Sequence, residues 1–74
     1  MIISRKEDHM DKIVIAEKLI KLRGNKPQKE VAEAVGVAQS TYAMYELAQR
    51  IPSDDVKIRI SKYFKKTVQS IFFT

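Results

Sequence analysis

For a chain of 74 residues we expect one domain with one small core, and no separate catalytic or ligand-sensing domain. It has no cysteine, no apolar run of signal-peptide length at its start and no stretch of roughly 18 apolar residues, so we expect a cytoplasmic protein without disulfides, thiolate metal sites or membrane spans. A formal net charge of +5 favours a polyanionic partner.

Residues 1–10 form the first segment, in which two isoleucines mix with charged residues without any period. This pattern is typical of a flexible arm, so we place the domain itself at 11–74. Asp11 is a favourable N-cap for a first helix, which is expected to end at Gly24. The apolar face of this helix is predicted to hold Ile13, Ala16, Leu19 and Ile20. Its polar face is predicted to hold Glu17, Lys18 and Lys21.

Residues 28–35 are predicted to form a second helix of two turns. Its narrow apolar face is formed by Val31, Ala32 and Val35. Pro27 suits the first helical position, where a proline loses no needed N–H and presets φ. Gly36 follows the helix directly, and glycine accepts the positive φ at which a helix stops and the chain turns sharply.

A third helix is predicted over residues 39–47, after a turn of about three residues. Its inward residues are expected to be Tyr42, Tyr45 and Leu47. Its outward residues are expected to be Gln39, Ser40, Ala43 and Met44. Two helices joined by so short a turn cross at a steep angle, which projects the second helix clear of the domain. This is the layout of a helix-turn-helix, whose second helix enters a DNA major groove.

The rest of the chain is predicted to form two more helices. Ser53 is a good N-cap, and two aspartates follow it in the first turn, where the helix dipole favours acids. The inward face of this fourth helix is expected to hold Val56, Ile60, Tyr63 and Phe64, and its outward face Lys57, Arg59 and Lys62. Thr67 then caps a short fifth helix at 68–72, which closes the core with Val68, Ile71 and Phe72. The sequence therefore predicts an all-α domain of five helices.

Several short motifs occur together along this chain. They are Gln28 at the start of the second helix, VAEAVGV at 31–37, QST at 39–41, YE at 45–46, Arg50 with Pro52, and ISKYFKKTVQSIF at 60–72. With these spacings, residues 16–73 resemble the Cro/cI-type (XRE) family of phage-repressor helix-turn-helix proteins. The resemblance implies a compact, lambda-repressor-like DNA-binding domain.

The same resemblance carries three local expectations. It implies that Lys21 pairs with Glu46, at a position where the family more often has arginine. Ala38 stands where the family usually has Ser or Thr, so a side-chain N-cap worth roughly 1 kcal/mol is missing. Ala48 replaces a turn glycine, which predicts that the third helix runs a little longer.

Residues near the N-terminus of the third helix reach base edges first when such a helix lies in a major groove. The candidate base-reading residues are Ala38, Gln39, Ser40, Ala43 and Met44. Gln39 is the strongest candidate, because its amide can donate to and accept from adenine at once, a contact worth ~1–3 kcal/mol of discrimination. Ala43 and Met44 offer only apolar contact, so we expect part of the operator to be read by its shape.

Three residues are candidates for phosphate contacts. Gln28 opens the second helix, where its side chain and the free backbone amides form a site suited to an anion. Thr41 and Arg50 are placed to bind phosphates on either side of the groove. Residues 25–50 are neutral, with three basic and three acidic residues, so their basic flanks are expected to supply the long-range attraction.

These features predict a sequence-specific transcriptional regulator of double-stranded DNA, and a repressor of phage or mobile-element type in particular. One recognition helix covers about half a turn of duplex, so we expect a homodimer on a palindromic operator with half-sites ~34 Å apart. Phe73 and residues 51–52 are the candidates for its interface.

Two alternatives come from other classes of protein. An antitoxin-like or other protein-interaction module could use the same fold, and exposed apolar surface on the fourth helix or near the C-terminus would favour it. An enzyme is not expected, because the single histidine lies in the arm and no pair of carboxylates flanks a predicted pocket. For the same reason we expect no metal ion or other cofactor.

Overall fold

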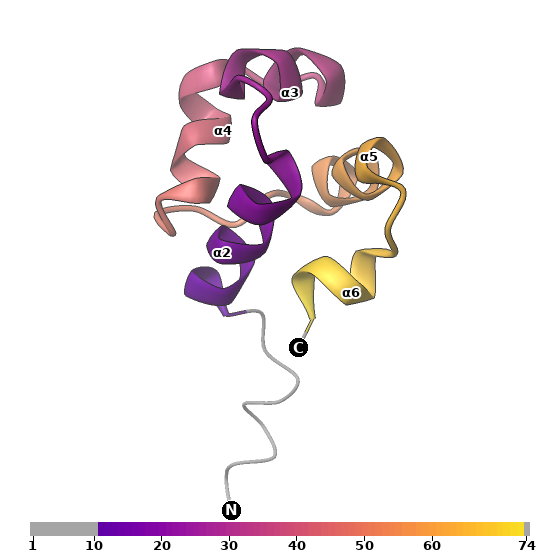
Figure 1. Ribbon diagram of the computed structural model, residues 1–74. Coiled ribbons are helices and arrows are strands. Elements are labelled where there is room, and N and C mark those ends of the chain that lie inside the picture. The colour runs from indigo at the N-terminus through magenta and orange to yellow at the C-terminus, as the bar shows by residue number, and fades with distance from the viewer. Residues whose placement is uncertain (1–10, 74) are drawn as a thin grey trace, which may run out of the picture.

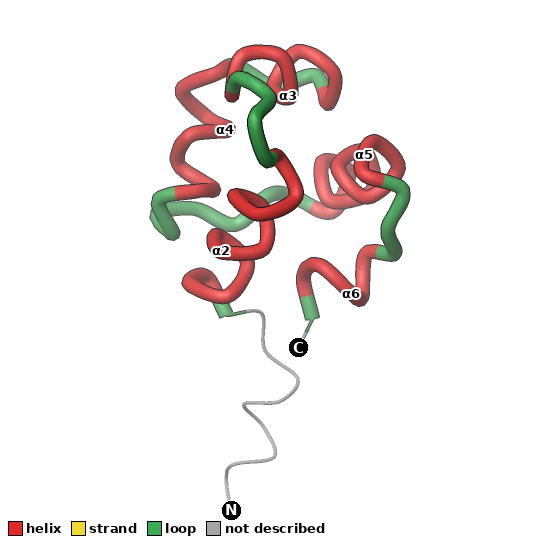
Figure 2. Tube along the Cα trace, viewed as in Figure 1, coloured by secondary structure: helices red, strands yellow, loops and turns green. Residues whose placement is uncertain are grey.

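The structure is a computed structural model that describes residues 11–73. Within this range the chain forms five helices and no strand (Figure 2). They are α2 (Lys12–Arg23), α3 (Gln28–Val35), α4 (Gln39–Glu46), α5 (Asp54–Phe64) and α6 (Val68–Phe72). The predicted all-α class with five helices is confirmed, and the predicted arm at 1–10 lies outside the described residues.

The helices surround one core, with α2 in the centre (Figure 1). One side of α2 packs against α4 and another side against α6. Helix α3 contacts both α4 and α5, and α5 in turn contacts α6, which closes the ring of helices. The buried apolar cluster takes residues from every helix, namely Ile15, Leu19, Val31, Ala32, Val35, Tyr42, Tyr45, Val56, Ile60, Ile71 and Phe72.

The buried face of α2 differs from the predicted one. Ala16 and Leu19 are buried as expected, but Ile13 and Ile20 are 63% and 46% exposed, and Ile15 is buried in their place. Four consecutive apolar residues at 13–16 fit more than one helical face, and the sequence alone does not choose between them. Packing against α4 and α6 selects the face through Ile15.

The helix starts follow their N-cap residues. The Asp11 carboxylate accepts from the backbone N–H of Ile13 at 2.9 Å, and Ser53 and Thr67 cap α5 and α6 in the same way. Pro27 has an extended backbone (ψ 148°) and is the N-cap of α3, so the helix begins at Gln28 as its predicted bounds have it and the proline stands just before the first helical position. Ala38 likewise precedes α4 without a side-chain cap, as its missing hydroxyl predicts.

The end of α4 also differs from the expectation. The helix stops at Glu46 instead of running longer, because Ala48 adopts the left-handed conformation (φ 61°) that favours glycine. The N–H of Gln49 donates to the Met44 carbonyl at 2.9 Å and that of Ala48 to Tyr45, which is the bonding of a Schellman turn. Leu47, predicted to point inward, is 63% exposed as a result of this turn.

In α5 the inward residues are confirmed, with Val56 and Ile60 buried and the two aromatic residues half-buried against the core. Lys57, expected on the outside, is only 5% exposed. Its ammonium lies 3.2 Å from the Asp54 carboxylate and 5.7 Å from the centre of the Phe73 ring. A lysine stem can cover apolar surface while its charged end reaches a partner, and this explains the difference.

Candidate nucleic-acid interface

Helix α4 has two different faces. Tyr42, Tyr45 and Glu46 are buried against the rest of the domain. The opposite face carries the exposed Gln39 and Ser40 together with the half-buried Ala43 and Met44, and the exposed Ala38 lies just before it. The structure thus places four of the five candidate base-reading residues on one face of α4 and the fifth, Ala38, directly before it, with Gln39 and Ser40 the exposed members on the helix.

Two buried aromatic rings lie on the inner face of α4. The rings of Tyr42 and Tyr45 lie edge to face, with their centres 6.0 Å apart. Such a pair adds ~0.5–1.5 kcal/mol to the burial of its area. The Tyr42 hydroxyl is buried and has no hydrogen-bond partner within residues 11–73, and burial raises the pKa of this phenol well above its ordinary value of 10.0. The hydroxyl therefore stays protonated.

The Glu46 carboxylate joins α4 to the two preceding helices. Arg23 at the end of α2 donates to it through Nε at 2.7 Å and through Nη2 at 2.9 Å. Gln28 at the start of α3 donates its amide N–H at 2.8 Å. The implied partner Lys21 is therefore wrong, since a fork-shaped guanidinium two residues further along takes its place. The preference of the family for arginine at this pairing, together with the nearby Arg23, was a signal in the sequence that the assignment to Lys21 did not use.

Glu46 remains charged in spite of its burial. Burial by itself raises the pKa of this carboxyl, but the hydrogen bonds from Arg23 and Gln28 and the charge of Arg23 outweigh it, so the pKa of Glu46 falls below its ordinary value of 4.5. The same hydrogen bond from Arg23 raises the pKa of that guanidinium. The position of α4 thus depends on a charged pair, Arg23 with Glu46, and on the added hydrogen bond from Gln28.

The turn between α3 and α4 is held by a residue that sequence reasoning missed. Gly36 has φ 77°, and the Arg59 guanidinium on α5 donates through Nη1 to the Val35 carbonyl at 3.1 Å. A Cβ at Gly36 would lie 2.6 Å from that Nη1 atom. Arg59 also lies 3.3 Å from the Asp55 carboxylate. Helical periodicity placed Arg59 on the outer face of α5, and only the packing of α5 beside α3 shows what it contacts.

The three candidate phosphate-binding residues lie around α4. Arg50 is exposed in the loop after the helix, and Thr41 is half-buried in its first turn. Gln28 is half-buried at the start of α3, where one N–H of its amide is taken by Glu46. A phosphate bound here would accept hydrogen bonds from the second N–H of the same amide group and from the N-terminal backbone amides of α3.

Within the described part of the chain, no group of three or more His, Cys, Asp or Glu side chains is placed to hold a metal ion. None of the helices in this part is both long and apolar enough to cross a membrane.

Comparison with known proteins agrees with this geometry. A family model described as helix-turn-helix matches residues 15–71, which is most of the chain. The chain belongs to this helix-turn-helix family. The resemblance to Cro/cI-type (XRE) repressors is thereby confirmed, and the protein is a DNA-binding transcription regulator.

A solved structure has the same fold. It is the solution structure of the SOS-response transcriptional repressor LexA from Eubacterium rectale, which superimposes with a TM-score of 0.79 over 84% of this chain and 68% of that chain. The two sequences are 22% identical, so this likeness supports the helix-turn-helix fold alone. A comparison with curated protein sequences gives no match.

Proposed function

We propose that this helix-turn-helix protein is a sequence-specific repressor, of phage or mobile-element type, that binds a palindromic operator and occupies a promoter. The observation that carries the proposal is that the two faces of α4 differ. One face is buried against the core, and Gln39 and Ser40 on the other face are exposed. A rigidly held helix with free polar side chains at its N-terminus suits insertion into a major groove. The proposed site of action is DNA in the cytoplasm.

We assign the contacts to bases and the contacts to phosphates to different residues. Gln39 recognises an adenine through its amide, Ser40 makes a less selective hydrogen bond, and Ala38, Ala43 and Met44 line the groove with apolar surface. Gln28, Thr41 and Arg50 bind phosphates and set the position of α4 without reading sequence. No ligand or metal ion is needed for this function, because repression requires only that the promoter be covered.

The proposed functional unit is a homodimer, since one α4 reaches only about half a turn of duplex and two would span half-sites ~34 Å apart. The proposed interface combines residues 51–52 with Phe73, whose side chain is 39% exposed. In the structure Pro52 is buried and Ile51 is half-buried, so Phe73 contributes most of the free apolar area of this set.

Selection from a pool of randomised duplexes tests the proposal. The expected product is an inverted repeat that the purified protein binds ~10³-fold or more tightly than random DNA at the same salt concentration. Affinity should be measured for both duplexes at two salt concentrations, because the phosphate contribution alone depends on salt. If no site is enriched and the only binding is weak and salt-sensitive, the sequence-specific role is wrong.

One observation favours a second candidate function, a protein-interaction module of antitoxin-like type on the same fold. Ile58 on α5 is 47% exposed and Phe73 after α6 is 39% exposed, so apolar surface is available on the helix and terminus where such a partner was expected. Co-purification of a stoichiometric protein partner, together with failure of the duplex selection, would favour this function over the first.

A further inference from the structure

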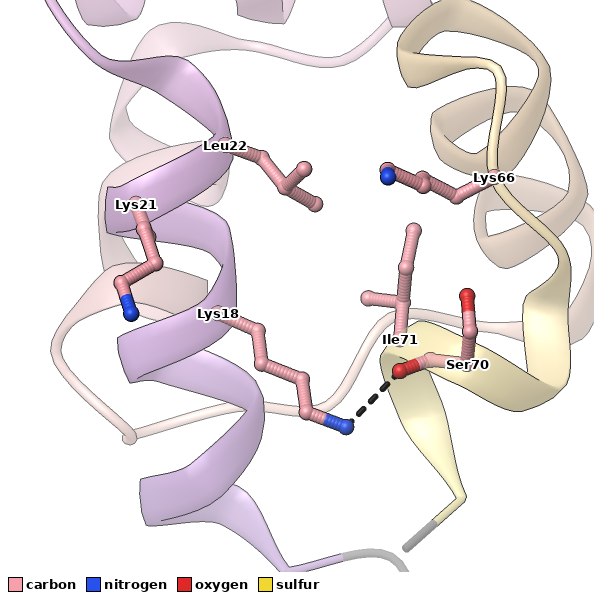
Figure 3. A pocket seen from close by; sticks show the side chains of 6 residues that line it. All are labelled: Lys18, Lys21, Leu22, Lys66, Ser70 and Ile71. Carbon is pink, nitrogen blue, oxygen red and sulfur yellow. Dashed lines mark hydrogen bonds between the residues drawn. The ribbon is translucent and has the colours of Figure 1, made fainter.

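A shallow groove lies between α2 and α6, in a part of the molecule that the proposed DNA contacts do not use. It encloses about 230 Å³ and is lined by Lys18, Lys21, Leu22, Lys66, Ser70 and Ile71. In Figure 3, Leu22 and Ile71 face each other across it, and Lys66 extends from the loop before α6 toward Leu22. Lys21 runs along the outer side of α2. Ile71 is only 1% exposed and closes the bottom of the groove, so the accessible apolar surface is mainly that of the half-buried Leu22, below a basic rim.

The rim has an excess of positive charge. Lys18 donates to the Ser70 carbonyl at 2.7 Å, which ties α2 to α6 at one end of the groove. The ion pairs among residues 11–73 involve other residues, so neither Lys21 nor Lys66 pairs with a carboxylate there. Among residues 11–73, the acidic side chain beside the groove is Glu17, in the adjoining hollow with Val14, Lys18 and Lys21. An acidic ligand would therefore complement the rim.

The groove is remote from the base-reading face. Helix α2 contacts α4 on one side and α6 on another, and Figure 1 shows it between the two. The α4 residues on the α2 side are buried ones, including Glu46 bonded to Arg23. DNA bound to the exposed face of α4 would leave the groove open, so the two surfaces can be occupied together.

The size and lining of the groove indicate the kind of ligand. Pockets that bury a whole small molecule usually measure ~300–1,000 Å³, and this one is smaller, which suits one or two side chains of a peptide. A nucleic-acid backbone would match the lysines but has no aliphatic side chain to pack against Leu22. An acidic peptide with large aliphatic side chains matches both features.

We infer that the groove between α2 and α6 binds an acidic segment of a partner protein, with an aliphatic side chain against the half-buried Leu22 and carboxylates on Lys21 and Lys66. This surface goes beyond the proposed DNA-binding function and does not depend on it. A second protein would bind the regulator through this groove while α4 is bound to DNA.

Titration of the full-length, isotopically labelled protein with synthetic peptides tests the inference by NMR. The probes are a short acidic peptide of Glu, Asp and Leu, the same peptide with serine in place of leucine, and the same peptide with lysine in place of its acids. The leucine-containing acidic peptide should shift the amide signals of the groove residues, and the other two should bind at least about tenfold more weakly. Equal binding of the serine peptide would overturn the role of the apolar contact with Leu22, and with it the inference.

Charge-reversal variants locate the binding. Lys66→Glu should weaken the acidic peptide about tenfold, because it places a like charge beside the carboxylates. Lys62→Glu is the matched control, since Lys62 is exposed on α5 and does not line the groove. Lys21→Glu provides a second, independent variant on α2. Equal losses in Lys66→Glu and Lys62→Glu would show attraction to overall charge only and would overturn the inference.

A random-sequence DNA duplex separates this surface from DNA binding. The peptide should bind the DNA-loaded protein as well as the free one, with the same groove signals shifted. If the duplex displaces the peptide and itself shifts the groove signals, the groove is a phosphate contact and the inference is wrong. If the peptide shifts the exposed residues of α4 instead, it merely imitates DNA, which would overturn the inference while leaving the proposed function intact.

Discussion

At the scale of single residues, the proposed base contact of Gln39 and the proposed phosphate contact of Arg50 can be tested separately. We expect Gln39→Ala to relax the preference at one base pair of each half-site by ~1–3 kcal/mol, because the amide contact to one base is lost. Arg50→Ala should weaken cognate and random DNA alike and lower the salt slope by about 0.9, the value for one lost phosphate contact. Affinities of both variants for operator and random duplex, at several salt concentrations, check this.

The comparison between the two variants distinguishes a base contact from a phosphate contact. If Gln39→Ala weakened random DNA as much as the operator, the assigned role of this residue would be wrong. Both side chains are exposed, so neither substitution is expected to change the stability of the domain by more than ~0.5 kcal/mol. Unfolding curves of the two variants serve as the control for this.

A substitution at Ala48 tests the left-handed backbone conformation that follows α4. Its φ of 61° costs an alanine roughly 1 kcal/mol that a glycine avoids. We therefore expect Ala48→Gly to raise the free energy of unfolding by about 0.5–1 kcal/mol. Ala34→Gly, at an exposed site inside α3, is the matched control and should lower it by a similar amount. Urea unfolding of the two variants measures both signs, and destabilisation by Ala48→Gly would contradict the left-handed turn.

At the scale of elements, the orientation of α4 depends on the bonds from Arg23 and Gln28 to Glu46. We expect Glu46→Gln to lower the free energy of unfolding at pH 7 by about 2 kcal/mol, because Arg23 loses its charged partner in a half-buried site. DNA affinity should fall with it, since α3 and α4 would no longer be held in one arrangement. Denaturant unfolding and duplex binding of the variant measure the two effects.

The same network predicts a dependence on pH. Because the pKa of Glu46 is lower in the folded protein than its ordinary value of 4.5, its contribution to stability is fully present above that pH and is lost as the pH falls through the folded pKa. Glu46→Gln should abolish this part of the acid sensitivity, whereas Glu33→Gln, at an exposed position of α3, should retain it. Unfolding midpoints between neutral and acid pH test the sign, and an unchanged acid sensitivity in Glu46→Gln would contradict it.

At the scale of the whole molecule, the prediction concerns assembly. A domain with one α4 gains specificity by pairing, so we expect a dimer on the operator whose two recognition helices are one turn of duplex apart. Sedimentation at micromolar protein, with and without operator, measures the stoichiometry. Phe73→Ser should weaken pairing, because it removes a side chain that is 39% exposed, and should leave single-site contacts unchanged. Only monomer in both experiments would exclude the dimer.

Much of the fold could be predicted from local patterns. The bounds of α3, the N-caps at Asp11, Ser53 and Thr67, and the turn at Gly36 agree with the structure, because each depends on interactions within a few residues. The helix-turn-helix itself belongs to this group, since two short amphipathic segments and one glycine determine it. The DNA-binding role was predicted from the same segment, and the family from that segment together with the motifs at 50–52 and 60–72.

What the sequence determined by itself was therefore the set of elements, the helix-turn-helix and the exposed position of Gln39 and Ser40 on its second helix. The tertiary structure alone decided the buried face of α2, the burial of Lys57, the pairing of Arg23 with Glu46 and the contact of Arg59 with the α3 carbonyl. The physical reason is distance along the chain. Periodicity and capping report on neighbours within a turn, whereas these features depend on which side chains from remote helices compete for the same space and the same hydrogen bonds.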